Sequence, residues 1–167
     1  MRGAGLLDEL RAAPVDALPA VLLVDLPSDS ALQARVAEAR ALLARLPSEA
    51  GVDAPAAMLA LLVSSWLGGH WGRGEARREA SDRAASECAA WRAAAGTNVR
   101  PLGAVRCGDS RARALLFKLC YDEAVLEPQG PRQVHHASSA PPPCKLLRAP
   151  TGAYQCLVGG ALVELYS

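Results

Sequence analysis

The sequence predicts an α+β domain in which helices come first and a small antiparallel sheet comes last. Apolar residues recur at three- and four-residue steps between positions 31 and 46, which is the spacing of an amphipathic helix. The pattern changes at Gly96, and residues 144–166 contain three short apolar runs of strand length. Gly159-Gly160 separates the last two runs, which is typical of a tight hairpin turn. Helices followed by a hairpin-built sheet indicate the α+β class.

The first elements are short. Leucines at positions 6, 7 and 10 indicate one or two helical turns that end before Pro14. Residues 21–26 form a continuous apolar run rich in β-branched side chains around one aspartate, which favours a short strand or an extended segment.

Three longer helices are predicted next. Ser28-Asp29-Ser30 is typical of an N-cap and precedes the helix over 31–46. Pro55 suits the first turn of a second helix, over 55–67, and glycines follow its last residue. Because this second helix is apolar nearly all round, we predict that it is the buried central helix. Residues 75–94 form a third and more polar helix.

The C-terminal part begins with an edge segment over 99–105 that leads into a turn. Asp109 or Ser110 then caps another helix, and we predict that Arg113 and Lys118 lie on its solvent-facing side. The apolar face of this helix consists of Ala112, Leu115, Leu116 and Leu119. Residues 126–143 are rich in proline and form a long loop before the strands.

Length and charge exclude several classes of protein. The chain has 167 residues and a formal net charge of +1, and neither half is basic enough for nucleic-acid binding. The longest apolar segment, residues 54–67, is shorter than the roughly 18 residues that a membrane-spanning helix needs. The first residues do not resemble a signal peptide. We therefore expect a cytoplasmic domain that binds neither nucleic acid nor a membrane.

The cysteines and histidines do not indicate a metal site or a cofactor. The five cysteines are odd in number and widely spaced, which favours reduced and buried thiols. No cysteine or histidine pair has the spacing of a zinc site. His135 and His136 are adjacent in the predicted loop, where neighbouring side chains point in different directions.

Residues 99–122 carry a family resemblance. Pro101-Leu102-Gly103, Gly108 and Arg113-Ala114-Leu115-Leu116-Phe117-Lys118 resemble the peptidase-like domain shared by armadillo repeat-containing protein 3 and the N-terminal regions of plant Raf-like kinases of ethylene and disease-resistance signalling. Further similarity lies in three later segments and one earlier helix end, namely Cys144-Lys145-Leu146-Leu147-Arg148, Ala153-Tyr154-Gln155, Val163-Glu164-Leu165 and residues 63–69.

The resemblance implies a papain/transglutaminase-like fold, with a central helix packed on a small antiparallel sheet. Transglutaminase-like peptidases hold a cysteine nucleophile at the N-terminus of that helix, a histidine on one strand and an aspartate on the next. Here those positions carry Ser110, Gly152 and Glu164. Serine without an adjacent base is a weak nucleophile, and glycine cannot accept a proton. The resemblance therefore implies a domain that has lost its catalytic residues.

An enzyme remains the competing interpretation. Cys107 lies three residues before Ser110 and could act as a displaced nucleophile of a cysteine hydrolase, with His135 or His136 as base. A buried strand position for Cys107 is the simpler interpretation. A third interpretation is a helical adaptor unrelated to peptidases, which strands near the C-terminus would exclude.

The resemblance also implies an organisation and a role. Residues 1–54 form an N-terminal helical extension, and residues 55–167 form the peptidase-like domain, which we expect to be truncated because the family continues beyond its last strand. The expected role is a regulatory or scaffolding contact with a protein partner. Similarity to the armadillo-containing member implies a cilium or a sperm flagellum as the setting. The sequence does not indicate an oligomeric state.

Overall fold

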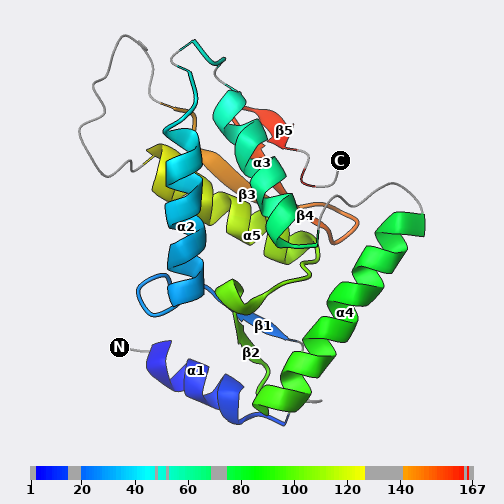
Figure 1. Ribbon diagram of the computed structural model, residues 1–167. Helices are drawn as coiled ribbons and strands as arrows, with labels where there is room; N and C mark the ends of the chain where they lie inside the picture. The colour runs from blue at the N-terminus through cyan, green and yellow to red at the C-terminus, as the bar shows by residue number, and fades with distance from the viewer. Residues whose placement is uncertain are drawn as a thin grey trace.

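A computed structural model of the chain describes residues 3–14, 20–47, 49–51, 53–68, 75–126, 141–163 and 165 (Figure 1). The helices are α1 (Gly3–Ala12), α2 (Ser30–Leu43), α3 (Ala54–Trp66), α4 (Glu75–Ala95) and α5 (Ser110–Tyr121). The strands are β1 (Val21–Leu23), β2 (Val99–Pro101), β3 (Cys144–Arg148), β4 (Tyr154–Val158) and β5 (Ala161–Val163). The α+β prediction is confirmed, and the strands exclude the all-helical adaptor.

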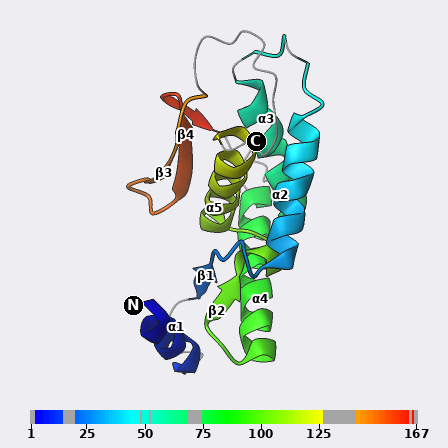
Figure 2. The same ribbon diagram turned by 90° about the vertical axis from the view of Figure 1, so that its left-hand side faces the viewer.

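Helix α5 is the central element of the core. It lies between the β3–β4–β5 sheet on one side and helices α2 and α3 on the other, as Figure 2 shows edge-on. Its Leu116, Phe117 and Cys120 are fully buried. The prediction that residues 55–67 form the buried central helix is wrong, because α3 covers one side of α5 and leaves Leu61 52% exposed. Apolar residues on all sides of this helix did not distinguish a helix that covers the core from one that is enclosed by it.

The C-terminal sheet is antiparallel in the order β3-β4-β5. In β4, Cys156 and Val158 are buried, and the Cys156 thiol lies 3.3 Å from the Ala114 carbonyl of α5, so alternate residues of β4 face α5. The predicted tight turn is confirmed, because Gly159 and Gly160 both have positive φ, 59° and 90°, which two-residue hairpin turns favour. The third predicted strand is shorter than expected and ends at Val163.

A second, two-stranded sheet links the N-terminal part to the segment before α5. Strand β1 pairs with β2 in parallel, with Val21 opposite Val99. Buried Asn98 donates its side-chain amide to the Pro14 carbonyl at 2.9 Å, which fixes the end of α1 beside β2. The strand predicted within 21–26 is therefore confirmed. The predicted edge segment 99–105 is a strand only to Pro101 and continues as a 3₁₀ turn.

Two aspartates begin the helices that flank this core. Asp29 Oδ1 accepts a hydrogen bond from the Leu32 N–H at 3.0 Å, and Asp109 Oδ1 accepts one from the Ala112 N–H at 2.9 Å. Each satisfies a donor that has no partner within its helix. The predicted caps of the second and fifth helices are confirmed, with Asp109 rather than Ser110 as the cap of α5.

Arg113 corrects a prediction made from helical periodicity. It was expected on the solvent-facing side of its helix, but it is fully buried. Its guanidinium donates to the Leu67 carbonyl at 2.9 Å and to the Gly108 carbonyl at 3.1 Å. Because the last carbonyls of α3 have no partner within the helix, a buried cation is favourable there. Lys118 is partly exposed, as expected, and pairs with Asp122 at 2.6 Å.

The core extends across the predicted domain boundary at residue 54. Leu32 and Val36 of α2 share one buried cluster with Leu59 of α3 and Leu116 of α5. The division into an extension and a peptidase-like domain stays a prediction. Within the described part of the chain, none of the helices combines the length and the apolar character needed to cross a bilayer.

Candidate functional site

Ser110 is the first residue of α5, where the resemblance places the nucleophile. Its hydroxyl oxygen accepts a hydrogen bond from the Tyr154 backbone N–H at 3.3 Å. The N-terminus of the central helix therefore meets the beginning of β4. In a peptidase that carries its nucleophile on the helix and its base on the strand, these two ends must lie next to each other in the same way.

Gly152 occupies the turn between β3 and β4. Its N–H donates to the Ala149 carbonyl at 2.8 Å, and its φ of +84° favours glycine. A side chain at this position would meet no atom within 4 Å. The strand residue that reaches Ser110, through its backbone N–H, is Tyr154, for which the sequence predicted no role at the site. Glu164 lies outside the described residues.

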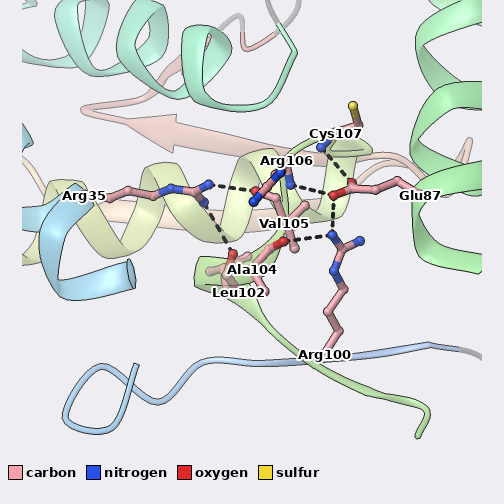
Figure 3. Close-up of polar contacts among 8 residues, drawn as sticks. All are labelled: Arg35, Glu87, Arg100, Leu102, Ala104, Val105, Arg106 and Cys107. Carbon is pink, nitrogen blue, oxygen red and sulfur yellow. Dashed lines mark hydrogen bonds and ion pairs between the residues drawn. The ribbon is translucent and has the colours of Figure 1, made fainter. Parts of the chain in front are cut away.

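The segment before Ser110, residues 102–109, is held in place from α2. The Arg35 guanidinium donates to the Val105 carbonyl at 2.7 Å and to the Leu102 carbonyl at 3.4 Å (Figure 3). Asp29 adds a second contact from the same helix, because its Oδ2 accepts the Gly103 N–H at 2.8 Å. One side of the segment is thereby fixed to the N-terminal half of α2.

Glu87 of α4 holds the opposite side of this segment. Its carboxylate accepts the N–H groups of Arg106 and Cys107 at 3.0 and 2.8 Å, and it pairs with the guanidinium of Arg100 (Figure 3). The Arg100 side chain is only 4% exposed and also donates to the Ala104 carbonyl at 2.9 Å. We call Arg35, Glu87 and Arg100 together the loop clamp.

These contacts shift the pKa of Glu87. Burial by itself would raise the pKa of this carboxyl group. The hydrogen bonds from Arg100 and from the two backbone N–H groups outweigh burial and hold the pKa below its usual value. The carboxylate is therefore charged at neutral pH, and it forms its ion pair with Arg100 there.

Gly103, a member of the motif that carries the family resemblance, leaves no room for a side chain. A Cβ atom at this position would lie 2.2 Å from Asp29 Oδ1 and 2.6 Å from Oδ2. The Asp29 carboxylate cannot retreat freely because it both caps α2 and binds the Gly103 N–H.

Gly103→Ala is accordingly expected to destabilise the protein by about 1–2 kcal/mol, the usual cost of losing a helix cap together with local overpacking. Urea denaturation would measure the loss. Gly51→Ala is the matched control, because a Cβ there meets nothing within 4 Å. Equal stability of the two variants would contradict the close packing of Gly103 on Asp29.

Cys107 is half-buried and lies in the loop between the 3₁₀ turn and α5. The expectation of a buried strand position is therefore wrong, because the strand has already ended at Pro101. His135 and His136, its predicted bases, lie outside the described residues. Their pairing with Cys107 stays a prediction.

Three of the backbone N–H groups near Ser110 are bound to side chains. Asp109 takes the Ala112 N–H, and Glu87 takes those of Arg106 and Cys107. Among the described residues there is no group of three side chains that could hold a metal ion. A hollow of about 370 Å³ opens elsewhere, beside the end of β1 and the start of α2, and its lining includes none of the predicted site residues.

The comparisons with known proteins identify one family. The family model described as EDR1/CTR1/ARMC3, peptidase-like, matches residues 5–130. The matched range runs from α1 to the residues just after α5 and includes the loop clamp and Ser110. No curated protein and no solved structure matches the chain.

Proposed function

Because the chain belongs to the EDR1/CTR1/ARMC3 peptidase-like family, we propose that it is a peptidase-like domain without catalytic activity that regulates or scaffolds a protein partner. We also propose that its architecture is of the papain/transglutaminase-like kind. The packing of α5 against an antiparallel sheet, with its N-terminus at the beginning of β4, supports that likeness.

The environment of Ser110 carries the proposal of inactivity. A serine nucleophile needs a neighbouring base that accepts its proton. The Ser110 hydroxyl instead contacts the Tyr154 backbone N–H, which is a donor. Gly152, at the position of the base, has no side chain to accept a proton. Two of the three catalytic roles therefore have no suitable group.

Two backbone N–H groups near this residue that could stabilise an oxyanion are already bound. Peptidases use preorganised N–H groups for the charge that develops in the transition state. Here the Ala112 N–H is bound to Asp109, and the Cys107 N–H is bound to Glu87. A carboxylate in that place repels a developing negative charge. The same contact argues against Cys107 as an efficient nucleophile.

The positive role follows from family membership and from composition. A near-neutral chain favours contact with protein over nucleic acid. The family includes armadillo repeat-containing protein 3, which directs the proposal to a cilium or a flagellum. The loop clamp supports this proposal, because it holds the motif segment in one position and so allows it to present a fixed surface to a partner.

Iodoacetamide labelling of the full chain at neutral pH separates inactivity from a cysteine hydrolase. We expect Cys107 to be alkylated no faster than Cys88, the other half-exposed cysteine, because the Glu87 carboxylate lies beside it, whereas reactive cysteines lie beside positive charges. Mass spectrometry of timed samples gives both rates. We also expect Ser110→Ala to hydrolyse activated ester substrates as slowly as the parent chain.

A Cys107 rate at least tenfold above that of Cys88, slowed by His135→Ala or His136→Ala, would establish the hydrolase instead. Binding is tested with axonemal extract from ciliated cells. A partner retained equally by the parent chain and by Ser110→Ala is expected, since contact does not use the degenerate site. Loss of that partner in Ser110→Ala would contradict a role independent of this residue.

A further inference from the structure

Two cysteines outside the degenerate site lie side by side in the C-terminal sheet. Cys144 of β3 pairs with Val158, and Cys156 of β4 pairs with Leu146, so the two cysteines are diagonal neighbours across the strands. Alternate residues of a strand share a face, and the paired positions place both side chains on the same face. The Cys156 thiol lies 3.3 Å from the Ala114 carbonyl, so this face packs on α5.

The two thiols also lie near enough to influence each other's pKa, and each is the largest influence on the pKa of the other. The Cys156 S–H itself donates to the Ala114 carbonyl. Cys144 is 5% exposed and begins β3, which is an edge strand, whereas Cys156 is fully buried. A small reagent that enters at the sheet edge therefore meets Cys144 first.

The surroundings give the two sulfurs different roles. The neighbouring Cys156 thiol lowers the pKa of Cys144 against the opposing effect of burial, and the Lys118 ammonium, which donates to the Cys144 carbonyl at 3.2 Å, adds to the lowering. The pKa of Cys156 is raised by the neighbouring Cys144 and by burial. Asp122 opposes the thiolate, but it is neutralised in part by its ion pair with Lys118. By contrast, burial raises the pKa of the Cys120 thiol to about 12.

We propose that Cys144 and Cys156 form a redox dithiol site that a hydroperoxide converts reversibly into a cross-strand disulfide. In the first step the Cys144 thiolate attacks one peroxide oxygen. The O–O bond breaks, Cys144 becomes a sulfenic acid, and hydroxide or alkoxide leaves and takes a proton. In the second step the Cys156 sulfur attacks the Cys144 sulfur. The S–S bond forms, the S–O bond breaks, and the hydroxyl leaves as water with the Cys156 proton. Two electrons pass from the two thiols to one peroxide.

Sheet geometry makes this disulfide easy to reduce. Diagonal neighbours in an antiparallel pair have Cα atoms about 7–8 Å apart, slightly more than the usual span of a disulfide of up to about 6.8 Å. The bond therefore requires the edge strand β3 to move toward β4, and strained disulfides are the labile ones. We expect dithiothreitol to restore both thiols fully.

The test uses the full chain, hydrogen peroxide as the oxidant and N-ethylmaleimide to block the thiols that remain. Peptide mass spectrometry is expected to find a Cys144–Cys156 disulfide, lighter by two hydrogens, while Cys120 stays a thiol. In Cys156→Ser, Cys144 should stop at the sulfenic acid, which dimedone traps. A disulfide joining other cysteines, or peroxide oxidation that leaves both Cys144 and Cys156 as thiols, would overturn the proposal.

A charge variant tests the site without removing either sulfur. Lys118→Gln is expected to slow disulfide formation, because the ammonium favours the Cys144 thiolate. Lys145→Gln is the matched control, since Lys145 follows Cys144 but is exposed on the other face of β3. An unchanged rate in Lys118→Gln, or equal slowing in Lys145→Gln, would refute the assigned role of Lys118. Circular dichroism of each variant verifies that it is folded.

Discussion

Replacing Leu116 with aspartate is expected to unfold the domain. Leu116 is fully buried at the centre of α5, between the C-terminal sheet and the helices on the opposite side. The substitution removes the apolar contacts of the leucine and places a carboxylate where it has no partner. The loss of about 5 kcal/mol or more is comparable with the whole stability of a small domain.

Circular dichroism during a thermal scan would measure this effect. The expected result for Leu116→Asp is no cooperative transition, and the helical signal should be weak at 25 °C. Leu61→Asp on α3 is the matched control, because Leu61 is largely exposed and a charge there remains in water. A cooperative transition of Leu116→Asp near that of the parent chain would contradict the position of α5 in the core.

Glu87→Gln is expected to destabilise the protein by about 2 kcal/mol, because breaking a partly buried ion pair takes away the carboxylate partner of a buried charge. The charge left is that of Arg100, which is almost completely buried. Glutamine keeps the size of the side chain, but Arg106 and Cys107 donate to different oxygens of the carboxylate, and glutamine offers only one acceptor oxygen. The loss therefore combines the charge of Glu87 with one hydrogen bond, and the pH dependence separates the two.

The pH dependence provides a second measurement of the same contact. The pKa of Glu87 is lower in the folded protein than its usual value of about 4.3. The stabilisation is thus complete above that value and is lost as the pH falls through the folded pKa. Urea denaturation at pH 7 and below pH 4 should show a large difference between parent and Glu87→Gln at pH 7 and a smaller one in acid.

Glu79→Gln is the control for this pair of experiments. Glu79 lies on the same helix and is exposed, so its removal should change stability by less than about 0.5 kcal/mol. A difference between parent and Glu87→Gln that stays constant with pH would show that the Glu87 charge does not stabilise the loop. So would a loss in Glu79→Gln as large as that in Glu87→Gln.

The loop clamp connects the family motif with the stability of the fold. Pro101-Leu102-Gly103 and Gly108 lie in or beside the segment that Arg35, Glu87 and Asp29 bind. A Cβ atom at Gly108 would lie 2.7 Å from a methyl carbon of Leu67. These motif residues thus have a structural function that does not depend on catalysis, which agrees with the proposal of a peptidase-like domain without catalytic activity.

The sequence by itself determined the features that depend on neighbouring residues. The boundaries of α2 and α5 follow from Asp29 and Asp109, whose carboxylates cap the N–H groups three residues later. The turn between β4 and β5 follows from Gly159-Gly160, since glycine adopts positive φ without strain. The family was also identifiable from a contiguous motif, because motif residues are read in chain order.

Only the tertiary structure decided which polar groups are buried and what they contact. Helical periodicity placed Arg113 toward solvent, but the carbonyl end of α3, 46 residues earlier, made burial favourable. In the same way Glu87 meets Cys107, and Tyr154 rather than Gly152 reaches Ser110. The energy of such contacts depends on groups far apart along the chain that folding brings within hydrogen-bonding distance, and no local pattern encodes that proximity.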